Sequence, residues 1–209
     1  VPAYAISDVK EQNWVQLTQS QFDPIRVTGK LWIVPSWHDA PDPHAINIVL
    51  DPGMAFGTGS HPTTRLCLEW LSEAITPDCS VLDYGCGSGI LGIAAARLGA
   101  GSVVGTDIDE KALEAAADNA TRNRVGMQLQ HSTARLEAQF DLVVANILTN
   151  PLCVLAPAIA ARVAPGGRLA LSGVLVTQSE QVITAYAPYI ALAVGAIDDG
   201  WVRLEGTRR

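Results

Sequence analysis

The stretch VLDYGCGSG at residues 81–89 decides the fold, because within it an apolar strand pattern gives way to a glycine loop. Residues 80–84 predict a short buried strand, and residues 89–98 predict a helix that Gly99 ends. Glycines at such a turn let the backbone approach a ligand where a Cβ would clash, and the following helix start offers unpaired N–H groups. The stretch therefore predicts a binding turn between a strand and a helix.

The glycines follow the spacing GxGxG, and position 90, where a dinucleotide fingerprint has its third glycine, is Ile. A nicotinamide-dependent oxidoreductase is the main competing enzyme class for such a loop, and Ile90 argues against it. The sequence also offers no recognisable acid or base for hydride transfer. The loop alone therefore predicts an α/β binding site of a different kind.

Outward from this loop, helices and strands alternate from Thr63 onward, which is the pattern of βαβ units and a parallel sheet. The helix TRLCLEWLSEAI precedes the loop, and Thr63 or Thr64 is expected to cap it. A helix over 152–163 is expected to end before Pro165-Gly166-Gly167. The remaining expected strands are 103–107, 127–131, 141–145 and 168–172, and the remaining expected helices are 110–123 and 178–187.

The last two expected strands, 191–196 and 201–206, flank Asp198-Asp199-Gly200. A short polar link that ends in Gly favours a tight antiparallel hairpin over a helical crossover. The sequence therefore predicts an α/β fold with a mostly parallel, seven-stranded, doubly wound sheet that ends in a C-terminal antiparallel hairpin. This arrangement resembles the Rossmann-like fold of class I methyltransferases and differs from that of dinucleotide dehydrogenases.

Residues 1–50 have a different texture, with five prolines and three of the five tryptophans of the chain. A short helix from Asp8 to about Thr18 is expected there. Strands are expected at residues 30–35 and 45–50. This region is expected to be less regular than the rest.

The composition is that of a well-packed globular protein, with 48% hydrophobic and 17% charged residues among 209. A formal net charge of −7 and a pI near 5.0 argue against a nucleic-acid surface, which needs clustered Lys and Arg. No apolar run approaches the roughly 20 residues of a membrane helix, and residues 1–10 show no signal-peptide pattern. We therefore expect a cytoplasmic protein without direct nucleic-acid or membrane partners.

The four cysteines, Cys67, Cys79, Cys86 and Cys153, form neither a CxxC pair nor a Cys/His cluster at metal-ligand spacing. They are interpreted as reduced thiols, and no metal site is expected. Cys86 lies inside the glycine loop, but no histidine is near it in the sequence to activate it. Its small size is enough to explain its place.

Asp107 ends the second strand of the alternating region, about 20 residues past the glycine loop. A carboxylate at this position can accept hydrogen bonds from both ribose hydroxyls of a bound nucleoside. Ile108 is expected to pack on the adenine, and Asp109 to cap the following helix. Since NAD and S-adenosylmethionine both carry this nucleoside, the pattern does not choose between them.

Asn146 opens the stretch NILT, residues 146–149, at the edge of the sheet where ligands bind in open α/β folds. Its side-chain amide can accept hydrogen bonds from an attacking amine, although an Asn that only satisfies a turn would look the same. The glycine-rich stretch at 51–64 is expected to fold over the ligand as a lid. His61, within that stretch, is interpreted as structural rather than as a general base.

Four stretches together resemble the family of methyltransferases that modify protein eleven of the bacterial large ribosomal subunit. They are LWIVPSW at 31–37, DPGMAFGTGSHPTT at 51–64, DYGCGSGIL at 83–91 and VANIL at 144–148. The resemblance spans nearly the whole chain, and GTGSHPTT together with NIL is its more specific part. It implies S-adenosylmethionine as the methyl donor and S-adenosylhomocysteine as the product. It also implies lysine ε-amines and an N-terminal α-amine of the ribosomal protein as acceptors.

The resemblance extends to individual residues. It implies that Asn146 is the catalytic residue that holds the amine. The Pro-Pro-aromatic continuation found after this asparagine in many amino-methyltransferases is absent, so a cation-stabilising aromatic has to come from elsewhere, with Phe56 as a candidate. Cofactor contacts are expected from Thr64, Asp83, Gly85, Gly87, Asp107, Ile108 and Asn146.

Members of this family carry a small N-terminal domain that grips the substrate. Residues 1–29 are expected to be the linker from it, and residues 30–209 the methyltransferase domain. Because the N-terminal domain itself is then expected to be absent from this sequence, most recognition of the protein substrate is expected to be lost. Two alternatives stay open: a methyltransferase that acts on another protein or on a small amine, and a non-catalytic methyltransferase-like binding domain. The intact glycine loop, Asp107 and Asn146 argue against the second.

Overall fold

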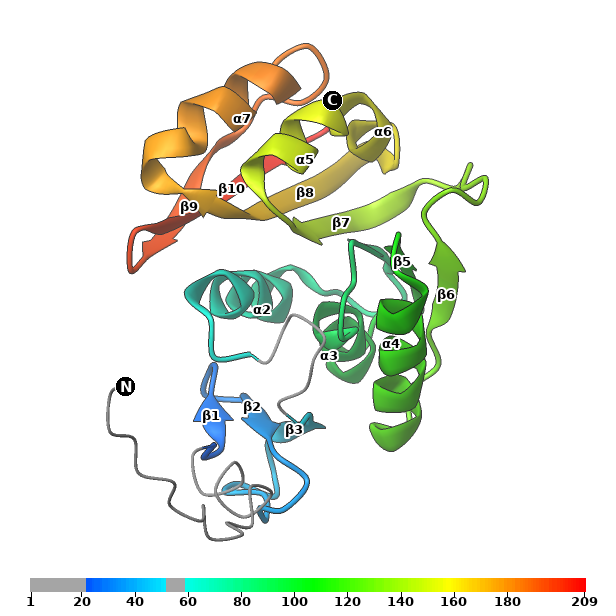
Figure 1. The fold of residues 1–209 in the computed structure, drawn as a ribbon, viewed down its shortest axis with the longest axis vertical. Coiled ribbons are helices and arrows are strands. Elements are labelled where there is room, and N and C mark those ends of the chain that lie inside the picture. The colour runs from blue at the N-terminus through cyan, green and yellow to red at the C-terminus, as the bar shows by residue number, and fades with distance from the viewer. Residues whose placement is uncertain (1–21, 52–58) are drawn as a thin grey trace, which may run out of the picture.

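The computed structural model describes residues 22–51 and 59–209. The expected helix at residues 8–18 lies outside these residues, as do Phe56 and most of the expected lid. Within them, the chain forms a seven-stranded sheet with helices on both faces, and a three-stranded sheet lies below the helices of one face (Figure 1). Three expected site residues, Asp83, Asp107 and Asn146, lie on strands of the larger sheet, and Gly85, Gly87 and Ile108 lie in the loops that follow two of these strands.

The seven-stranded sheet has the strand order β6-β5-β4-β7-β8-β10-β9. Neighbouring strands from β6 to β8 are parallel, whereas β10 pairs antiparallel with both β8 and β9. This confirms the predicted α/β fold with its terminal hairpin. The strands are β4 Ser80–Tyr84, β5 Ser102–Asp107, β6 Gln128–His131, β7 Phe140–Asn146, β8 Val163–Leu175, β9 Ala193–Asp198 and β10 Trp201–Thr207.

Helices cover both faces of this sheet: α2, α3 and α4 lie below it in Figure 1, and α5, α6 and α7 lie above it. A hydrophobic core lies on each face of the sheet. Successive residues of the central strands pack alternately into one core and the other, because side chains alternate along a strand. Val81 and Val144 pack with α2 and α3, whereas Leu82 and Val143 pack with α5 to α7. The helices are α2 Pro62–Ala74, α3 Ile90–Leu98, α4 Glu110–Arg122, α5 Thr149–Val154, α6 Ala156–Ala160 and α7 Ser179–Tyr186, with the 3-10 helix η1 at Val176–Gln178.

The strand order reverses between β4 and β7. From β4 the chain moves outward through β5 to β6, then returns to the other side of β4 with β7 and β8. In open α/β sheets, ligands bind beyond the carboxyl ends of the strands at such a switch point. Gly85 directly follows β4 and Asn146 ends β7, so both lie at this point.

The three-stranded sheet consists of β1 Ile25–Arg26, β2 Leu31–Val34 and β3 Ile46–Val49. The second and third of these strands confirm two predictions, whereas β1 was not expected. Asn123, just past α4, anchors the sheet: its Oδ1 accepts from the Val49 N–H at 2.7 Å and its Nδ2 donates to the Val49 carbonyl at 2.8 Å. This paired contact holds the end of β3 against the main domain.

The C-terminal hairpin turns at Asp199 and Gly200, whose φ angles are 45° and 77°. Two successive residues with positive φ are typical of the tight turns that match the twist of antiparallel strands. Trp201 pairs with Asp198 across the turn. The hairpin prediction is confirmed, with β9 beginning two residues later than expected.

The segment after Asn146 differs most from the prediction of one helix over 152–163. Two short helices, α5 and α6, meet at Leu155 instead, because Pro157 has no N–H to continue the helical hydrogen-bond pattern. β8 begins already at Val163, and the expected turn at residues 165–167 lies inside this strand. Backbone hydrogen bonds of 2.8 and 2.9 Å join Gly166 and Gly167 to Arg208.

Candidate active site

The glycine loop after β4 lies in the left-handed region at all three of its glycines. The φ angles of Gly85, Gly87 and Gly89 are 76°, 53° and 79°. The Gly85 N–H donates to the carbonyl of Thr106 on β5 at 2.8 Å, and a Cβ at Gly85 would lie 2.5 Å from Cγ2 of Ile147. Only glycine therefore fits where the loop passes between β5 and the end of β7.

Asp107, at the end of β5, holds the glycine loop from the other side. Its Oδ2 accepts from the N–H of Gly87 at 2.8 Å, and its Oδ1 accepts from the N–H of Asp109 at 3.0 Å. A carboxylate has about four acceptor positions, so capacity for ribose hydroxyls remains. Asp109 caps α4 by accepting from the Lys111 N–H, as predicted.

Ile108 presents a large apolar side chain to solvent beside this carboxylate, with 74% of the residue exposed. Its backbone is nonetheless held, because the carbonyl of Ile108 lies 2.8 Å from Nε2 of His131, at the end of β6. The other ring nitrogen of His131 lies 2.7 Å from the hydroxyl of Thr133. An exposed apolar residue on a fixed backbone is well suited to pack against a flat base.

Asp83 is almost fully buried and faces the first turn of α3. Its Oδ2 accepts from the N–H of Gly92 at 2.9 Å, whereas its buried Oδ1 has no partner among the described residues. Burial raises the pKa of this carboxyl to about 7, and the nearby charge of Asp107 adds to the rise. The hydrogen bond from Gly92 to Oδ2 of Asp83 thus fixes the start of α3. The Oδ1 of Asp83 can still accept a hydrogen bond.

Asn146 at the end of β7 meets Thr64 from α2. Its Nδ2 donates to the Thr64 hydroxyl at 3.3 Å, and Thr64 is buried. Gly173 on β8 (φ 85°) makes room for the backbone that follows, since a Cβ there would lie 2.3 Å from the carbonyl oxygen of Ile147. Three elements distant in sequence thus fix the surroundings of the Asn146 amide.

The start of α2 differs from the prediction that Thr63 or Thr64 caps this helix. His61 is the cap: its Nδ1 accepts from the N–H of Thr63 at 3.3 Å, and Pro62 occupies the first helical position. The His61 ring also contacts Trp201 edge to face, with ring centroids 4.8 Å apart. These contacts support the structural role that the sequence suggested for His61.

The thiol in the glycine loop is poorly suited to act as a nucleophile. Burial raises the pKa of Cys86 far above its ordinary value, and the carboxylates of Asp83 and Asp107 raise it further. Because the thiolate is the reactive form, this thiol stays inert. All four cysteines are free.

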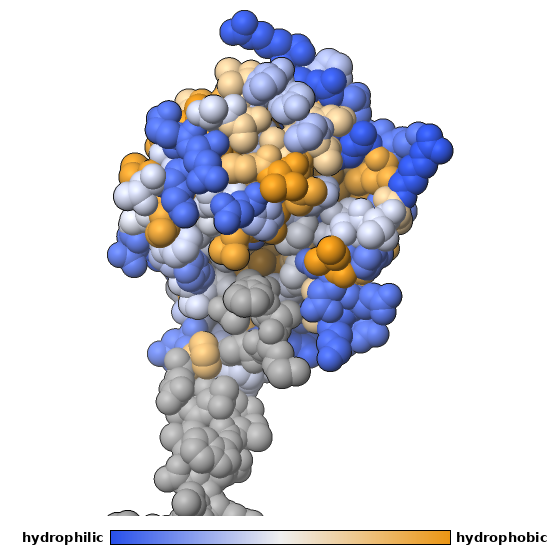
Figure 2. Space-filling view, turned by 45° about the horizontal axis from the view of Figure 1, so that its top comes forward, coloured by the Kyte–Doolittle hydropathy of each residue, from blue (hydrophilic) through white to orange (hydrophobic). Residues whose placement is uncertain are grey.

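The described part of the surface carries several exposed apolar side chains besides Ile108. On the face in Figure 2, apolar and polar side chains lie interspersed. Leu148, close to the site, is 68% exposed.

Among residues 22–51 and 59–209 no helix is long and apolar enough to cross a membrane. The same residues contain no group of three or more His, Cys, Asp or Glu arranged to hold a metal ion.

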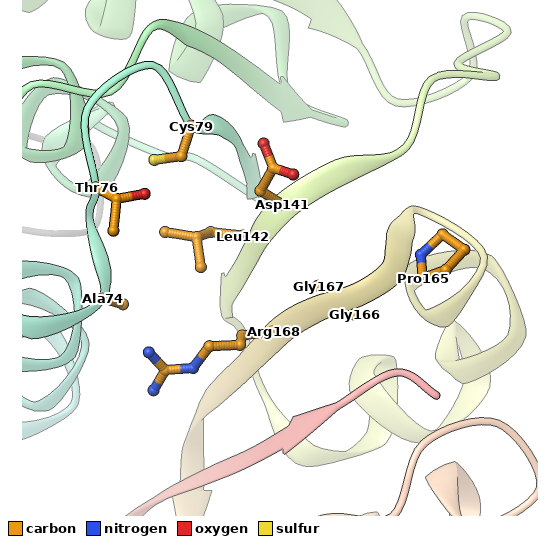
Figure 3. A pocket seen from close by; sticks show the side chains of 9 residues that line it. All are labelled: Ala74, Thr76, Cys79, Asp141, Leu142, Pro165, Gly166, Gly167 and Arg168. Atoms are coloured by element: carbon orange, nitrogen blue, oxygen red, sulfur yellow. The ribbon is translucent and has the colours of Figure 1, made fainter.

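A cavity of about 350 Å³ is present elsewhere in the fold. Figure 3 shows the residues that line it. Cys79, Asp141 and Arg168 line it, and they lie near the starts of β4, β7 and β8. This is the amino-terminal edge of the parallel strands, opposite to the edge where ligands bind in such sheets. The cavity is therefore not part of the candidate site.

One protein family matches all 209 residues of the chain. The family described as "Ribosomal protein L11 methyltransferase (PrmA)" matches residues 1–209, the whole chain.

The chain belongs to the ribosomal protein L11 methyltransferase family.

Curated relatives in this family are similar to the chain over 208 residues. The ribosomal protein L11 methyltransferase of Dechloromonas aromatica is 62% identical over all of this chain and 70% of its own length. That of Cupriavidus metallidurans is 59% identical, over 68% of its length. The crystal structure of ribosomal protein L11 methylase from Lactobacillus delbrueckii subsp. bulgaricus matches with a TM-score of 0.82 and 34% identity, over 90% of this chain and all of that one.

The family makes the protein a methyltransferase with the Rossmann-like class I fold, and this fold implies use of S-adenosylmethionine. A T. Thermophilus 16S rRNA methyltransferase in complex with AdoMet and guanosine shares the fold, with a TM-score of 0.63 and 25% identity over 74% of this chain and 45% of that one. The family and the fold thus agree with the class that the sequence predicted.

The structure brings all seven predicted site residues to one edge of the sheet. Asn146 contacts Thr64, and Asp107 contacts Gly87. Gly85 lies against the neighbours of both, Thr106 and Ile147. Asp83 closely precedes Gly85 in the chain, and Ile108 directly follows Asp107. Sequence reasoning missed Gly173 and His131. The Ser-Gly at the end of an expected strand was the available signal for the first, and a His that ends an expected strand was the signal for the second.

Proposed function

We propose that the protein transfers methyl groups from S-adenosylmethionine to lysine ε-amines and an N-terminal α-amine of ribosomal protein L11. The observation that carries this proposal is the position of Asn146. Its amide ends β7 at the switch point of the sheet, next to the glycine loop. Family membership and the names of the relatives support L11 as the substrate.

The residues present fit the cofactor. Asp107 keeps acceptor positions for ribose hydroxyls, and the buried Oδ1 of Asp83 has acceptor capacity not used by the described residues. The proposed contact set is Thr64, Asp83, Gly85, Gly87, Asp107, Ile108 and Asn146. When bound, S-adenosylmethionine supplies a methyl group on a sulfonium, and the neutral thioether that remains after transfer is an excellent leaving group.

The protein's own task is then mainly to position the amine. A lysine ε-amine in water has a pKa of about 10.4 and must enter the site neutral. Desolvation near the end of β7 lowers the pKa of a bound amine, because burial disfavours the charged form. The Oδ1 of Asn146 and a neighbouring backbone carbonyl would accept from the amine hydrogens and direct its lone pair. Solvent can remove the amine's proton before attack, so no dedicated base is needed.

The test is the variant Asn146→Ala, measured with unmodified L11 by mass spectrometry and with S-adenosylhomocysteine by calorimetry. Because misplacement of a reacting group by about 1 Å costs about 100-fold in rate, we expect kcat to fall by about that factor. The affinity for S-adenosylhomocysteine should change far less. Asn47→Ala is the matched control, since Asn47 is also part-buried but lies on β3.

Equal losses of rate and affinity would reduce Asn146 to a cofactor-binding residue. Saturable binding of S-adenosylhomocysteine without transfer to any amine would instead favour a non-catalytic binding domain. Transfer to small amines or other proteins but not to L11 would favour the remaining alternative. A cytoplasmic location, where L11 and the cofactor are both available, is part of the proposal.

A further inference from the structure

The C-terminal hairpin touches the start of α2 at three successive places. The Trp201 ring contacts that of His61, and Asp198 forms an ion pair with Arg65. Farther along β10, Nη1 of Arg203 donates to a carbonyl of α2 at 3.0 Å. The first two turns of α2, which carry Thr64, are thus joined to the hairpin.

Arg65 and Asp198 form the charged part of this junction. Both Nε and Nη2 of Arg65 donate to Oδ2 of Asp198, although 133 residues separate them. The two side chains are 39% and 29% exposed. Partly exposed ion pairs contribute little to global stability because solvent screens them. Whether the ion pair positions α2 has therefore to be tested separately from whether it stabilises the fold.

The hairpin itself is firmly placed. Its turn carbonyl at Gly200 accepts from the N–H of Val176 at 2.9 Å, and Trp201 pairs with Leu175 at the end of β8. β8 in turn pairs with β7 up to Asn146, which lies opposite Ser172. The hairpin is therefore tied through the sheet to the strand that carries the candidate catalytic residue.

These contacts close a ring. It runs from Asn146 through its hydrogen bond to Thr64, along α2 to Arg65, across the ion pair to Asp198, and back through β10, β8 and β7. The bond to Thr64 uses the Nδ2 of the Asn146 amide, which leaves its Oδ1 in a defined orientation. A displacement of α2 would release this amide to rotate about its last side-chain bond.

We propose that Arg65 and Asp198 are positioning residues for methyl transfer, which hold Thr64 so that it orients the amide of Asn146. The inference rests on the proposed role of Asn146. The ion pair acts at a distance from the reacting atoms, so neither residue is catalytic. Loss of the pair leaves the sheet and the glycine loop in place and loosens only the orientation of the amide.

The neighbouring charge of Glu69 has to be considered in choosing variants. Burial raises the pKa of this carboxyl, Arg65 lowers it, and Asp198 raises it again. Arg203 and Glu73 also act on this carboxyl, and removal of the charge of Arg65 or Asp198 changes the electrostatics at Glu69. Asp198→Asn removes the ion pair with little change in shape, and Arg65→Gln removes it with a shorter, neutral side chain. The double variant Arg65→Asp with Asp198→Arg restores a pair of opposite charges.

The experiment measures kcat, KM for L11 and the thermal midpoint of each variant. We expect either single variant to lower kcat at least 10-fold with KM and the midpoint nearly unchanged, and the charge-swapped variant to recover much of the lost kcat. Arg135→Gln is the control, because Arg135 also pairs with a carboxylate, that of Glu137, but is exposed in the loop between β6 and β7 and, within the described part of the chain, makes no ion pair or hydrogen bond with α2 or the hairpin. Unchanged kcat in both single variants would overturn the proposal, as would a loss that only follows the thermal midpoint.

A second readout does not depend on activity. The side-chain amide signals of Asn146 in an NMR spectrum, assigned by their loss in Asn146→Ala, report the orientation of this group. They should shift in Asp198→Asn and return in the charge-swapped variant, while the signals of Asn47 stay in place. Signals that do not move would refute the link. If they move although Asn146→Ala keeps full activity, the link stands and the catalytic role of Asn146 fails.

Discussion

The carboxylate of Asp107 accepts a hydrogen bond from the backbone N–H of Gly87 at 2.8 Å, across 20 residues of sequence. The end of β5 thereby holds the middle of the glycine loop. The same carboxylate is the proposed acceptor for the ribose hydroxyls. Loop geometry and nucleoside binding therefore depend on one side chain.

Asp107→Ala should weaken S-adenosylhomocysteine binding by at least about 100-fold, because two hydrogen bonds to a charged acceptor are together worth about 3–6 kcal/mol. Titration calorimetry measures this directly. Asp109→Ala is the control, since it removes the same charge two residues away and costs only the cap of α4, about 1 kcal/mol of stability. Equal affinities of the two variants would exclude Asp107 as the ribose acceptor.

Ile108→Ser should weaken the same ligand about 5- to 10-fold, as expected when roughly half of an Ile side chain loses its apolar contact. The thermal midpoint should stay unchanged, because Ile108 is 74% exposed in the protein without ligand. Val154→Ser removes an equally exposed apolar side chain from α5 and should affect neither quantity. A variant Ile108→Ser with normal affinity would rule out the proposed contact with adenine.

Gly173→Ala should lower both stability and methyl transfer. An alanine there is strained by its positive φ, about 1–2 kcal/mol, and also meets the carbonyl oxygen of Ile147 at 2.3 Å. Gly166→Ala separates the two effects, because Gly166 has a similar φ of 77° but open space around it. Chemical denaturation should show a loss at Gly173 larger by about 2 kcal/mol, and only that variant should lose activity. Matching losses would mean that the contact with Ile147 is unimportant.

The buried carboxyl of Asp83 makes stability depend on pH. Its folded-state pKa of about 7 lies above the ordinary value of 3.8 for an aspartate, so the folded protein binds the proton more tightly than the unfolded chain. The stabilising effect of the bound proton is therefore full below about pH 4 and is lost as the pH rises through about 7. Asp83→Asn cannot ionise, and its midpoint relative to the parent protein should rise between pH 5 and pH 8. A difference that is constant over this range would contradict the raised pKa.

The elements with strong local signals could be predicted from the sequence. The apolar run and glycines around Gly85 define β4, the loop and α3, because each signal acts within a few residues. The helix over 152–163 was wrong because Pro157 divides it and because long-range pairing with Arg208 recruits residues 165–167 into β8. Strand pairing with distant residues is not visible in a local pattern.

The site shows the same limit. Asp107 and Asn146 could be placed at the correct edge of the sheet, since the carboxyl ends of parallel strands meet there. Their partners could not be predicted, because the contact from Asn146 to Thr64 spans 82 residues and that from Arg65 to Asp198 spans 133. The cap at His61 was missed since histidine is not a usual capping residue.

The reversal of strand order between β4 and β7 also separates the residues around the methyl donor from those around the methyl acceptor. Most of the residues proposed to hold the nucleoside come from β4, β5 and the loops that follow them, whereas those that surround the amine come from β7 and β8. A change of acceptor can therefore accumulate on one side of the sheet while the donor side is inherited intact. One fold can in this way serve many acceptors with a single donor.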